Sequence, residues 1–425
     1  MAGRHFLFVP GPTHVPDRIQ RAMHRAMVDH RSSAFPELPL SIFRDLAALL
    51  RTKSGRAFVF AATGTGMWEA ALTNTLSPGD RVLALRYGQF SHNFADAARR
   101  LGYRVDQIEI PWGEGADPSA IEEALAADRA HEIQGVLLVH NETSTGVRSD
   151  VAAVRRAIDA AKHPALLYVD GVSSIGSLEF RMDDWGVDLA ITGSQKGLML
   201  PPGLGILGVS ARALERIEAA RSPRAFFDLR DQLRHNAGGY FPYTPPLSLL
   251  FGLREALDML LEEGLDAVVA RHHRLGEGVR RAVRAWGLDT CSRGPQWHSD
   301  TVTAVMTPEG ISAARVIDLA FRRYDLSLGG GLGEMAGRLF RIGHLGDVNE
   351  LMLLGALAGA EMAMNDAGIR VDLGRGVAAA ATWYRETMPE VRAGASDAPG
   401  ATAGTMPGTS PRESESARRG VTTRA

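Results

Sequence analysis

Lys196 is one of only three lysines in the chain, although lysine and arginine together number 47. It stands in TGSQKG (192–197), directly after an apolar stretch, and no amphipathic helix face requires a cation there. Arginine could not replace a lysine that forms a Schiff base with an aldehyde. Lys196 is therefore either a solvated loop residue or a buried nucleophile, and the scarcity of lysine favours the nucleophile.

Two other charged residues interrupt apolar segments. Asp170 ends ALLYVD (165–170), where a partly buried carboxylate needs a partner. Its carboxylate could cap a helix or accept hydrogen bonds from a loop. Alternatively, it could pair with a protonated pyridine nitrogen and make that ring an electron sink. Arg341 lies in LFRIGHLG (339–346), where it could pair with an acidic residue or hold a substrate carboxylate through two hydrogen bonds.

A glycine-rich turn, ATGTGMWEAAL (62–72), follows one apolar strand and opens a helix. The N–H groups and dipole of a helix N-terminus suit a phosphate, Gly64 and Gly66 permit close approach, and Thr65 adds a hydroxyl. A purely structural turn is the alternative. GLGILG (203–208) matches a dinucleotide-binding pattern but reads as a strand, so NAD binding is not predicted.

The elements around these residues indicate an α/β fold. Strand-like segments alternate with amphipathic helices, at 57–60, 81–85, 135–140, 165–170 and 188–192. Such wholly apolar segments are typical of a mainly parallel sheet, at whose carboxyl edge ligands bind. A smaller α+β unit follows, with strands expected at 301–306 and 338–343. We predict an N-terminal segment (1–20), a large domain (21–265), a small domain (266–385) and a disordered tail (386–425).

Composition excludes several classes of protein. The net charge of −2 provides no field for nucleic acid. The single cysteine, Cys291, excludes disulfides and cysteine-based zinc clusters, and the scattered histidines, such as His272 and His273, indicate no metal site. No segment approaches the ~20 apolar residues of a membrane helix, and the start lacks a signal peptide. We expect a cytoplasmic enzyme with no membrane, nucleic-acid or metal partner.

The chain resembles the class V, fold-type I pyridoxal-phosphate enzymes, and among them the serine–glyoxylate and alanine–glyoxylate aminotransferases. The resemblance extends over about residues 5–385. The motifs that carry it are PGPTHVP (10–16), DHRSSAF (29–35), TGTGMWEAALTN (63–74), VHNETSTGV (139–147), LYVDGVSSIGSLEFRMDDWGVD (167–188), TGSQKGLMLPPGLG (192–205), PYTPP (242–246) and FRIGHLG (340–346).

The resemblance implies pyridoxal 5′-phosphate as cofactor. Lys196 would carry it as a Schiff base and then move a proton, and Asp170 would pair with its ring nitrogen. The resemblance assigns further cofactor contacts to Thr65, Gly66, Met67, Phe90, Thr143, Gln195 and Thr244. Phosphate would bind Thr65, Gly66 and Gln195, together with Thr244 of a neighbouring subunit. Met67 would offer only its backbone N–H.

Three further assignments concern the ring and the substrate. Thr143 would bond the phenolic oxygen, and Phe90 would stack on the ring, with Tyr87 as the alternative. Which of Tyr240, Phe241 and Tyr243 contacts the cofactor stays open. Arg341 would hold the substrate carboxylate, beside the backbone of Pro10 and Gly11.

The implied reaction is ping-pong transfer of an amino group from a small L-amino acid to glyoxylate. Serine is the first expectation, which would give hydroxypyruvate and glycine, and alanine and aspartate are alternative donors. The active unit would be a homodimer or a tetramer. The rival hypotheses are a cysteine desulfurase using Cys291, a phosphoserine transaminase and a non-catalytic protein of the same fold.

Overall fold

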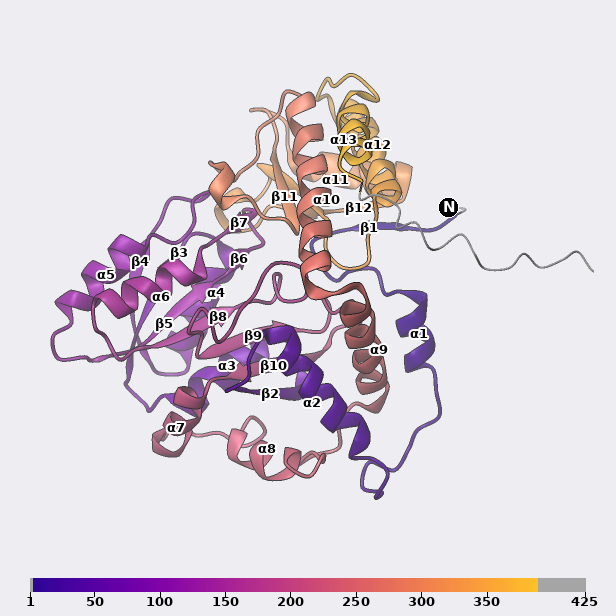
Figure 1. Ribbon diagram of the computed structural model, residues 1–425. Helices are drawn as coiled ribbons and strands as arrows, with labels where there is room; N and C mark the ends of the chain where they lie inside the picture. Colours follow the sequence, from indigo (N-terminus) through magenta and orange to yellow (C-terminus); the bar gives the residue numbers. More distant parts are fainter. Residues whose placement is uncertain (1–2, 389–425) are drawn as a thin grey trace, which may run out of the picture. The chain divides into compact units, whose positions relative to one another are not determined.

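A seven-stranded sheet forms the centre of the computed structural model, which describes residues 3–388 (Figure 1). Its order is β2-β10-β9-β8-β5-β3-β4, and only β10 runs antiparallel to its neighbours. The strands are β2 (Arg56–Ala62), β3 (Arg81–Arg86), β4 (Arg104–Glu109), β5 (Ile133–Val139), β8 (Leu166–Asp170), β9 (Leu189–Gly193) and β10 (Gly203–Val209). The predicted α/β fold with a mainly parallel sheet is confirmed.

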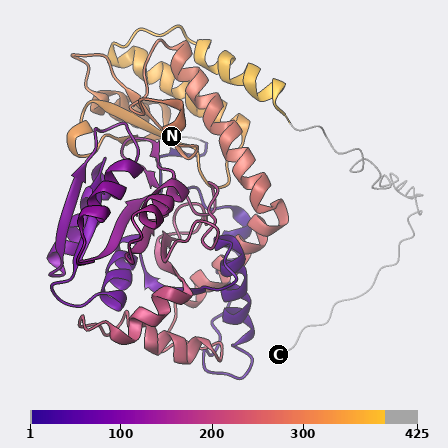
Figure 2. The same cartoon turned by 60° about the vertical axis from the view of Figure 1, so that its left-hand side comes forward.

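Alternate residues of each strand enter two separate hydrophobic clusters, because successive side chains point to opposite faces. In β8, for example, Tyr168 belongs to one cluster and Val169 to the other. Residues of α3 (Gly64–Thr75), α4 (Gln89–Arg100) and α7 (Ala211–Ala219) join the first cluster. The second includes residues of α2 (Glu37–Leu50), α5 (Pro118–Ala127), α6 (Val151–Ala160) and α9 (Leu247–Glu263), so helices cover both faces (Figure 2).

A second sheet of four strands, ordered β1-β12-β13-β11, forms most of the smaller unit. Three of its strands come from late in the chain: β11 (Val302–Met306), β12 (Leu326–Gly330) and β13 (Leu339–Gly343). The sequence analysis missed β12, β4 and β1 (Phe6–Phe8). The packed helices are α10 (Leu265–Ala285), α11 (Ala313–Tyr324), α12 (Glu350–Ala367) and α13 (Arg375–Glu386).

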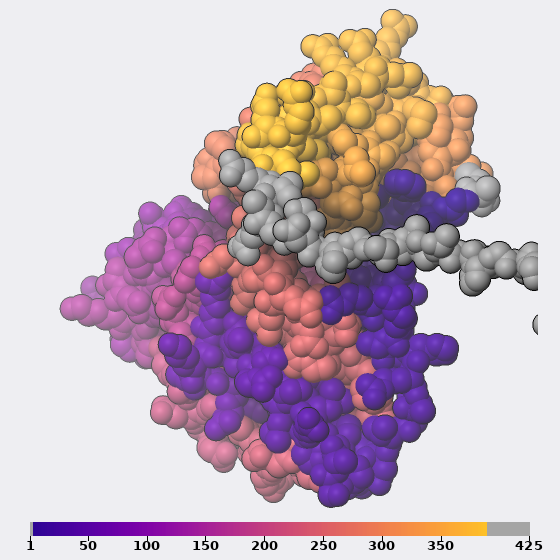
Figure 3. Space-filling view, turned by 45° about the vertical axis from the view of Figure 1, so that its right-hand side comes forward, coloured from indigo at the N-terminus to yellow at the C-terminus, as the bar shows by residue number. Residues whose placement is uncertain are grey.

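Strand β1 pairs in parallel with β12, although some 320 residues separate them. Figure 3 shows this N-terminal segment lying against the C-terminal part of the molecule. The chain then passes through Pro10 and Gly11 to α1 (Asp17–Met23). The N-terminal segment thus belongs to the small sheet at one end and reaches the large sheet at the other.

The predicted domain division at 265/266 coincides with the junction between α9 and α10, and it stays a prediction. The predicted tail begins at Glu386, which is the last residue of α13, whereas residues 389–425 lie outside the described residues. None of the described helices is long and apolar enough to cross a membrane. Short segments complete the chain: β6 (Asn141–Glu142), β7 (Val147–Arg148), α8 (Leu229–Asn236), and the 3-10 turns η1 (Pro295–Trp297) and η2 (Gly333–Met335).

Candidate active site

Lys196 follows β9, and its ammonium donates a hydrogen bond to the carbonyl oxygen of Pro10. Burial and, to a lesser degree, the nearby charge of Arg341 lower its pKa to about 8, against the opposing effect of Asp170. A Cβ atom at Gly11 would overlap Nζ of Lys196, so only glycine fits where the N-terminal segment passes the lysine. The lysine is therefore a half-buried amine with a lowered pKa and not a solvated loop residue.

Asp170 ends β8 and is only 4% exposed. Its Oδ1 accepts from the backbone N–H of Val172 at 2.8 Å, and its Oδ2 accepts from Nε1 of Trp68 at 2.8 Å. Burial raises its pKa to about 6, and Lys196 is close enough to lower that value. Among the described residues no cation forms an ion pair with Asp170. Its hydrogen bonds to a backbone N–H and an indole N–H therefore leave its charge unpaired in a buried position.

Arg341 lies in β13 and is 7% exposed. Its Nε donates to the carbonyl oxygen of Gly330 at 2.8 Å, and its Nη1 donates to that of Thr143 at 3.0 Å. Burial lowers its pKa to about 10, whereas Glu142 raises it. Because its described partners are neutral carbonyls, the guanidinium keeps its charge and its Nη2 donors for an incoming carboxylate.

The first turn of α3 is the candidate anion site. Thr63 caps the helix by accepting from the N–H of Gly66 at 3.4 Å, and Thr65 is exposed beside it. Gln195 lies beside this turn. A Cβ atom built onto Gly193 would be 3.0 Å from Oε1 of Gln195 and 3.1 Å from the backbone nitrogen of Gly64, so both atoms adjoin the same point. This buried Oε1 has no hydrogen-bond partner among the described residues. The free N–H groups of this helix turn and the Nε2 donors of Gln195 are the groups that could donate to a phosphate, whereas Oε1 can only accept.

Met67 does not fit its predicted role. Its N–H donates to the carbonyl oxygen of Thr63 at 3.1 Å, so that N–H is already used inside the helix. Its side chain is fully buried and packs against Gly205. Met67 is one residue too far along α3 to present a free amide, because each residue beyond the first turn bonds the preceding turn. We therefore remove it from the candidate site.

Glu142 connects Phe90, in the first turn of α4, to Thr143, in the loop between β6 and β7. The fully buried Glu142 accepts from the N–H of Ser91 at 2.9 Å and of Phe90 at 3.3 Å, at the start of α4. Phe90 stays half-buried and Thr143 hydrogen-bonds Ser173 at 2.7 Å. Tyr87, the alternative ring partner, is buried in the core with its hydroxyl bonded to Val139.

Sequence reasoning missed three side chains of this region: Trp68, Glu142 and Ser173. All three stand inside the motifs TGTGMWEAALTN, VHNETSTGV and LYVDGVSSIG, so their positions were visible. Their partners were not, because each contacts a residue at least 30 positions away or on another loop. Thr244 is exposed near Phe60 and Tyr243, and nothing in the single chain brings it to Lys196.

The rival motifs take structural positions. GLGILG lies in β10, next to the edge strand β2, and forms no phosphate-binding turn before α7. GGGLGE connects β12 to η2, where Gly330 supports Arg341. Cys291 is buried, and burial raises its pKa to about 11, which opposes a desulfurase nucleophile. No group of three potential metal ligands occurs within residues 3–388.

Comparisons with known proteins agree with this geometry. The family model described as Aminotransferase class-V matches residues 6–317. The serine–glyoxylate aminotransferase of Methylorubrum extorquens is 58% identical over 389 residues, covering 90% of this chain and 97% of that protein. The L-aspartate–glyoxylate aminotransferase of Paracoccus denitrificans is 52% identical over 387 residues, covering 91% and 98%.

Solved structures agree as well. The pyridoxamine–pyruvate aminotransferase from Mesorhizobium loti has a TM-score of 0.84 and 31% identity, covering 91% of this chain and 98% of that one. A cysteine desulfurase from Thermococcus onnurineus, at 15% identity and a TM-score of 0.63, shares the fold alone. The matched residues include β1, the α3 turn, Asp170 and Lys196, and the chain belongs to the class-V aminotransferase family.

Proposed function

We propose that this chain is a pyridoxal-phosphate-dependent aminotransferase that moves the amino group of L-serine to glyoxylate, giving hydroxypyruvate and glycine. The observation that carries the proposal is the convergence of Lys196, Asp170 and Arg341, which have no ion-pair partner among the described residues; Asp170 and Arg341 are buried and Lys196 is half-buried. A buried charge without a partner is unfavourable unless a ligand completes it. Lys196 would bind the cofactor aldehyde, Asp170 its ring nitrogen and Arg341 the substrate carboxylate.

The residues present fit pyridoxal phosphate. The α3 turn with Thr65 and Gly66 would hold the phosphate through its free N–H groups and the Thr65 hydroxyl, and Gln195 would donate from its Nε2. Asp170 would bond the ring nitrogen, Phe90 would cover one ring face and Thr143 would reach the phenolic oxygen. The bound cofactor supplies an aldehyde for covalent attachment and a ring that accepts electrons from the substrate.

The chain's own residues then control the removal of the Cα proton of the substrate. A pKa near 8 leaves part of Lys196 as the neutral amine at physiological pH, as both a nucleophile and a base require. Arg341 would orient the substrate carboxylate so that the Cα proton faces Nζ of Lys196. The carbonyls of Gly330 and Thr143 hold the guanidinium in place, so little ordering is needed on binding.

The preference for serine over aspartate rests on the relatives. The serine-named relative is 58% identical to this chain, and the aspartate-named relative, at 52%, keeps aspartate as the alternative. Arg341, whose charge acts on Lys196, is the candidate partner of the α-carboxylate that these donors share.

A donor screen tests this proposal. Serine, alanine and aspartate should each be paired with glyoxylate, with glycine and the 2-oxo acid quantified and kcat/KM compared. We expect serine to give the highest value. A higher value for aspartate or alanine would replace serine as donor, and no glycine with any donor would reject the function.

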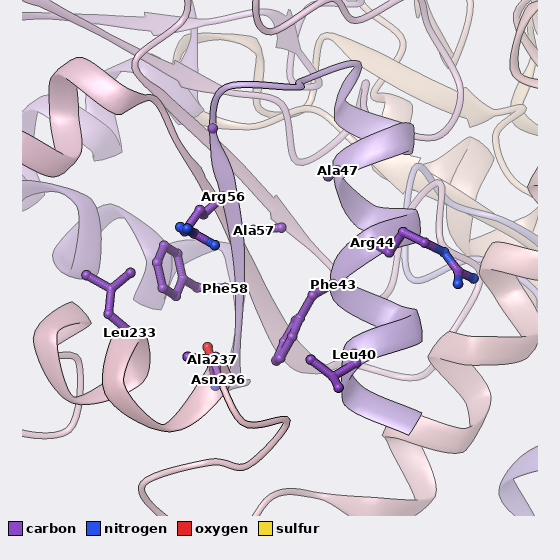
Figure 4. A pocket seen from close by; sticks show the side chains of 11 residues that line it. Leu40, Phe43, Arg44, Ala47, Arg56, Ala57, Phe58, Leu233, Asn236 and Ala237 are labelled. Atoms are coloured by element: carbon purple, nitrogen blue, oxygen red, sulfur yellow. The ribbon is translucent and has the colours of Figure 1, made fainter. Parts of the chain in front are cut away.

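We also propose that the active unit is a homodimer. A hollow of about 370 Å³ lies between α2, β2 and α8 and is lined by apolar side chains that include Leu40, Phe43 and Phe58 (Figure 4). Next to it along the edge strand β2, the exposed rings of Phe226 and Tyr243 stack at 5.3 Å. Exposed aromatic residues at a sheet edge favour a protein interface. There, Thr244 would reach the phosphate of the partner's site.

The single cysteine is consistent with a reducing compartment, and we propose that the enzyme is cytoplasmic.

A further inference from the structure

Trp68 lies in the second turn of α3 with its indole directed to the sheet. The side chain is 4% exposed, and its ring stacks on Phe94 with centroids 5.2 Å apart and planes at 18°. Within residues 3–388 it is the only side chain that donates a hydrogen bond to Asp170. Neither the sequence motif nor the proposed reaction gives this tryptophan a role.

We propose that Trp68 is a positioning residue for Asp170, whose indole N–H fixes the orientation of the carboxylate and keeps it ionised for the cofactor nitrogen. The inference rests on the proposed function, in which Asp170 pairs with that nitrogen. Tryptophan suits this task because its indole offers one donor, no acceptor and no charge.

The geometry leaves the carboxylate one orientation. One oxygen is held by the backbone of Val172 and the other by Nε1 of Trp68, both at 2.8 Å. Rotation of the carboxylate would break both bonds in a buried site, where unpaired polar groups are costly. A carboxylate oxygen accepts more than one hydrogen bond, so a second lone pair remains for the ring nitrogen.

Electrostatics lead to the same conclusion. Burial raises the pKa of Asp170 to about 6, and the two hydrogen bonds from Val172 and Trp68 counteract that rise. Two titratable groups also face Asp170: Glu142 raises its pKa and Lys196 lowers it. Without the indole N–H the pKa would move toward neutrality. A larger fraction of Asp170 would then be protonated and unable to pair with a pyridinium.

The test is cofactor binding by the cofactor-free protein, with pyridoxal phosphate as the probe and Trp68→Phe as the variant. Dissociation constants should be measured by equilibrium dialysis from acidic pH to about pH 9. In the wild type, affinity should fall as the pH drops through the pKa of Asp170. In Trp68→Phe this midpoint should move up by about one pH unit, the scale of one lost hydrogen bond to a charged group. Affinity should therefore drop roughly tenfold on the acid side and little above pH 8.5.

Trp286→Phe is the matched control. Its indole also donates to a buried carboxylate, Glu361, at 2.9 Å, but in the small domain. The control should lower the melting temperature and leave the midpoint of cofactor binding unchanged. An unmoved midpoint in a folded Trp68→Phe, or an equal movement in Trp286→Phe, would overturn the role of Trp68. A wild type that binds no pyridoxal phosphate would instead reject the proposed function, and this inference with it.

A second measurement needs no stable Trp68 variant. In wild-type protein labelled with ¹⁵N-tryptophan, one indole N–H resonance should titrate with the midpoint of Asp170. The same resonance should become independent of pH in Asp170→Asn. If no indole resonance follows pH in this range, Trp68 does not sense the charge of Asp170 and the inference fails.

Discussion

At the scale of single residues, burial acts in opposite directions on the two central groups. It lowers the pKa of Lys196 to about 8 and raises that of Asp170 to about 6. Lys196 therefore titrates close to physiological pH, as a group that exchanges protons with a substrate requires, whereas Asp170 depends on its hydrogen bonds to stay ionised. The same burial makes each of them costly to the cofactor-free fold, so function and stability oppose each other at these positions.

Lys196→Ala should abolish transamination, because neither of the other lysines can replace it. Lys53 and Lys162 are both exposed and neither follows a strand end of the site. Borohydride reduction of the pyridoxal-phosphate-loaded wild type, followed by peptide mapping, should place the label on Lys196. A label on Lys53 or Lys162 would refute the assignment.

Asp170→Asn should lose most turnover, because a neutral amide cannot hold a proton on the ring nitrogen. It should also change how stability depends on pH. The pKa of Asp170 is about 6 in the folded chain and 3.8 for an ordinary aspartate, so the folded wild type binds more protons between these values. Its stability therefore falls as pH rises through this window.

The amide does not titrate, so the stability of Asp170→Asn minus that of the wild type should grow between about pH 4 and pH 6. The gain is at most about 3 kcal/mol, from a difference of roughly two pH units. Urea unfolding of both cofactor-free proteins at several pH values measures it. A constant difference across this window would mean that Asp170 is not buried as described.

At the scale of elements, one buried carboxylate joins two helices of the small domain. Glu361 of α12 is 1% exposed and accepts from Nε1 of Trp286. It also accepts from the N–H groups of Gly374, Gly376 and Val377 at 2.5, 2.8 and 3.2 Å, where α13 begins. Because those amides have no partner inside α13, Glu361 serves as the N-cap that the local sequence lacks.

Glu361→Gln should therefore destabilise the protein by about 2–4 kcal/mol, since the amide replaces an acceptor by a donor among several N–H groups. The melting temperature should fall while kcat at low temperature changes little. Asp150→Ala is a suitable control, because it removes an exposed N-cap of α6 and should cost only about 1 kcal/mol. A melting temperature equal to that of the wild type would contradict the capping role of Glu361.

At the scale of the whole molecule, the proposed dimer makes each cofactor site composite. Mixing two inactive variants, Lys196→Ala and Thr244→Trp, should restore activity, because each heterodimer contains one site with both native residues. Light scattering should show a dimer for each variant alone. A fully active monomer, or exchanged subunits without recovered activity, would contradict the composite site.

Much of the site could be predicted from the sequence because the determining signals are local. Wholly apolar strands identified the parallel sheet. Asp170 at the end of one strand and Lys196 in the loop after another stood out as candidates without knowledge of the strand order. The N-caps of α5 and α6 are local signals as well, because Asp117 and Asp150 each accept from the first turn of the helix that directly follows them.

The tertiary structure decided what depends on contacts between distant segments. Pairing of β1 with β12 brings Gly11 against Lys196, and the packing of α3 on the sheet brings Trp68 to Asp170. It also excluded Met67, whose amide is used within its own helix. Such contacts depend on strand order, on helix rotation and on which face a side chain takes. Spacing along the chain does not determine these, because they result from how the complete core packs.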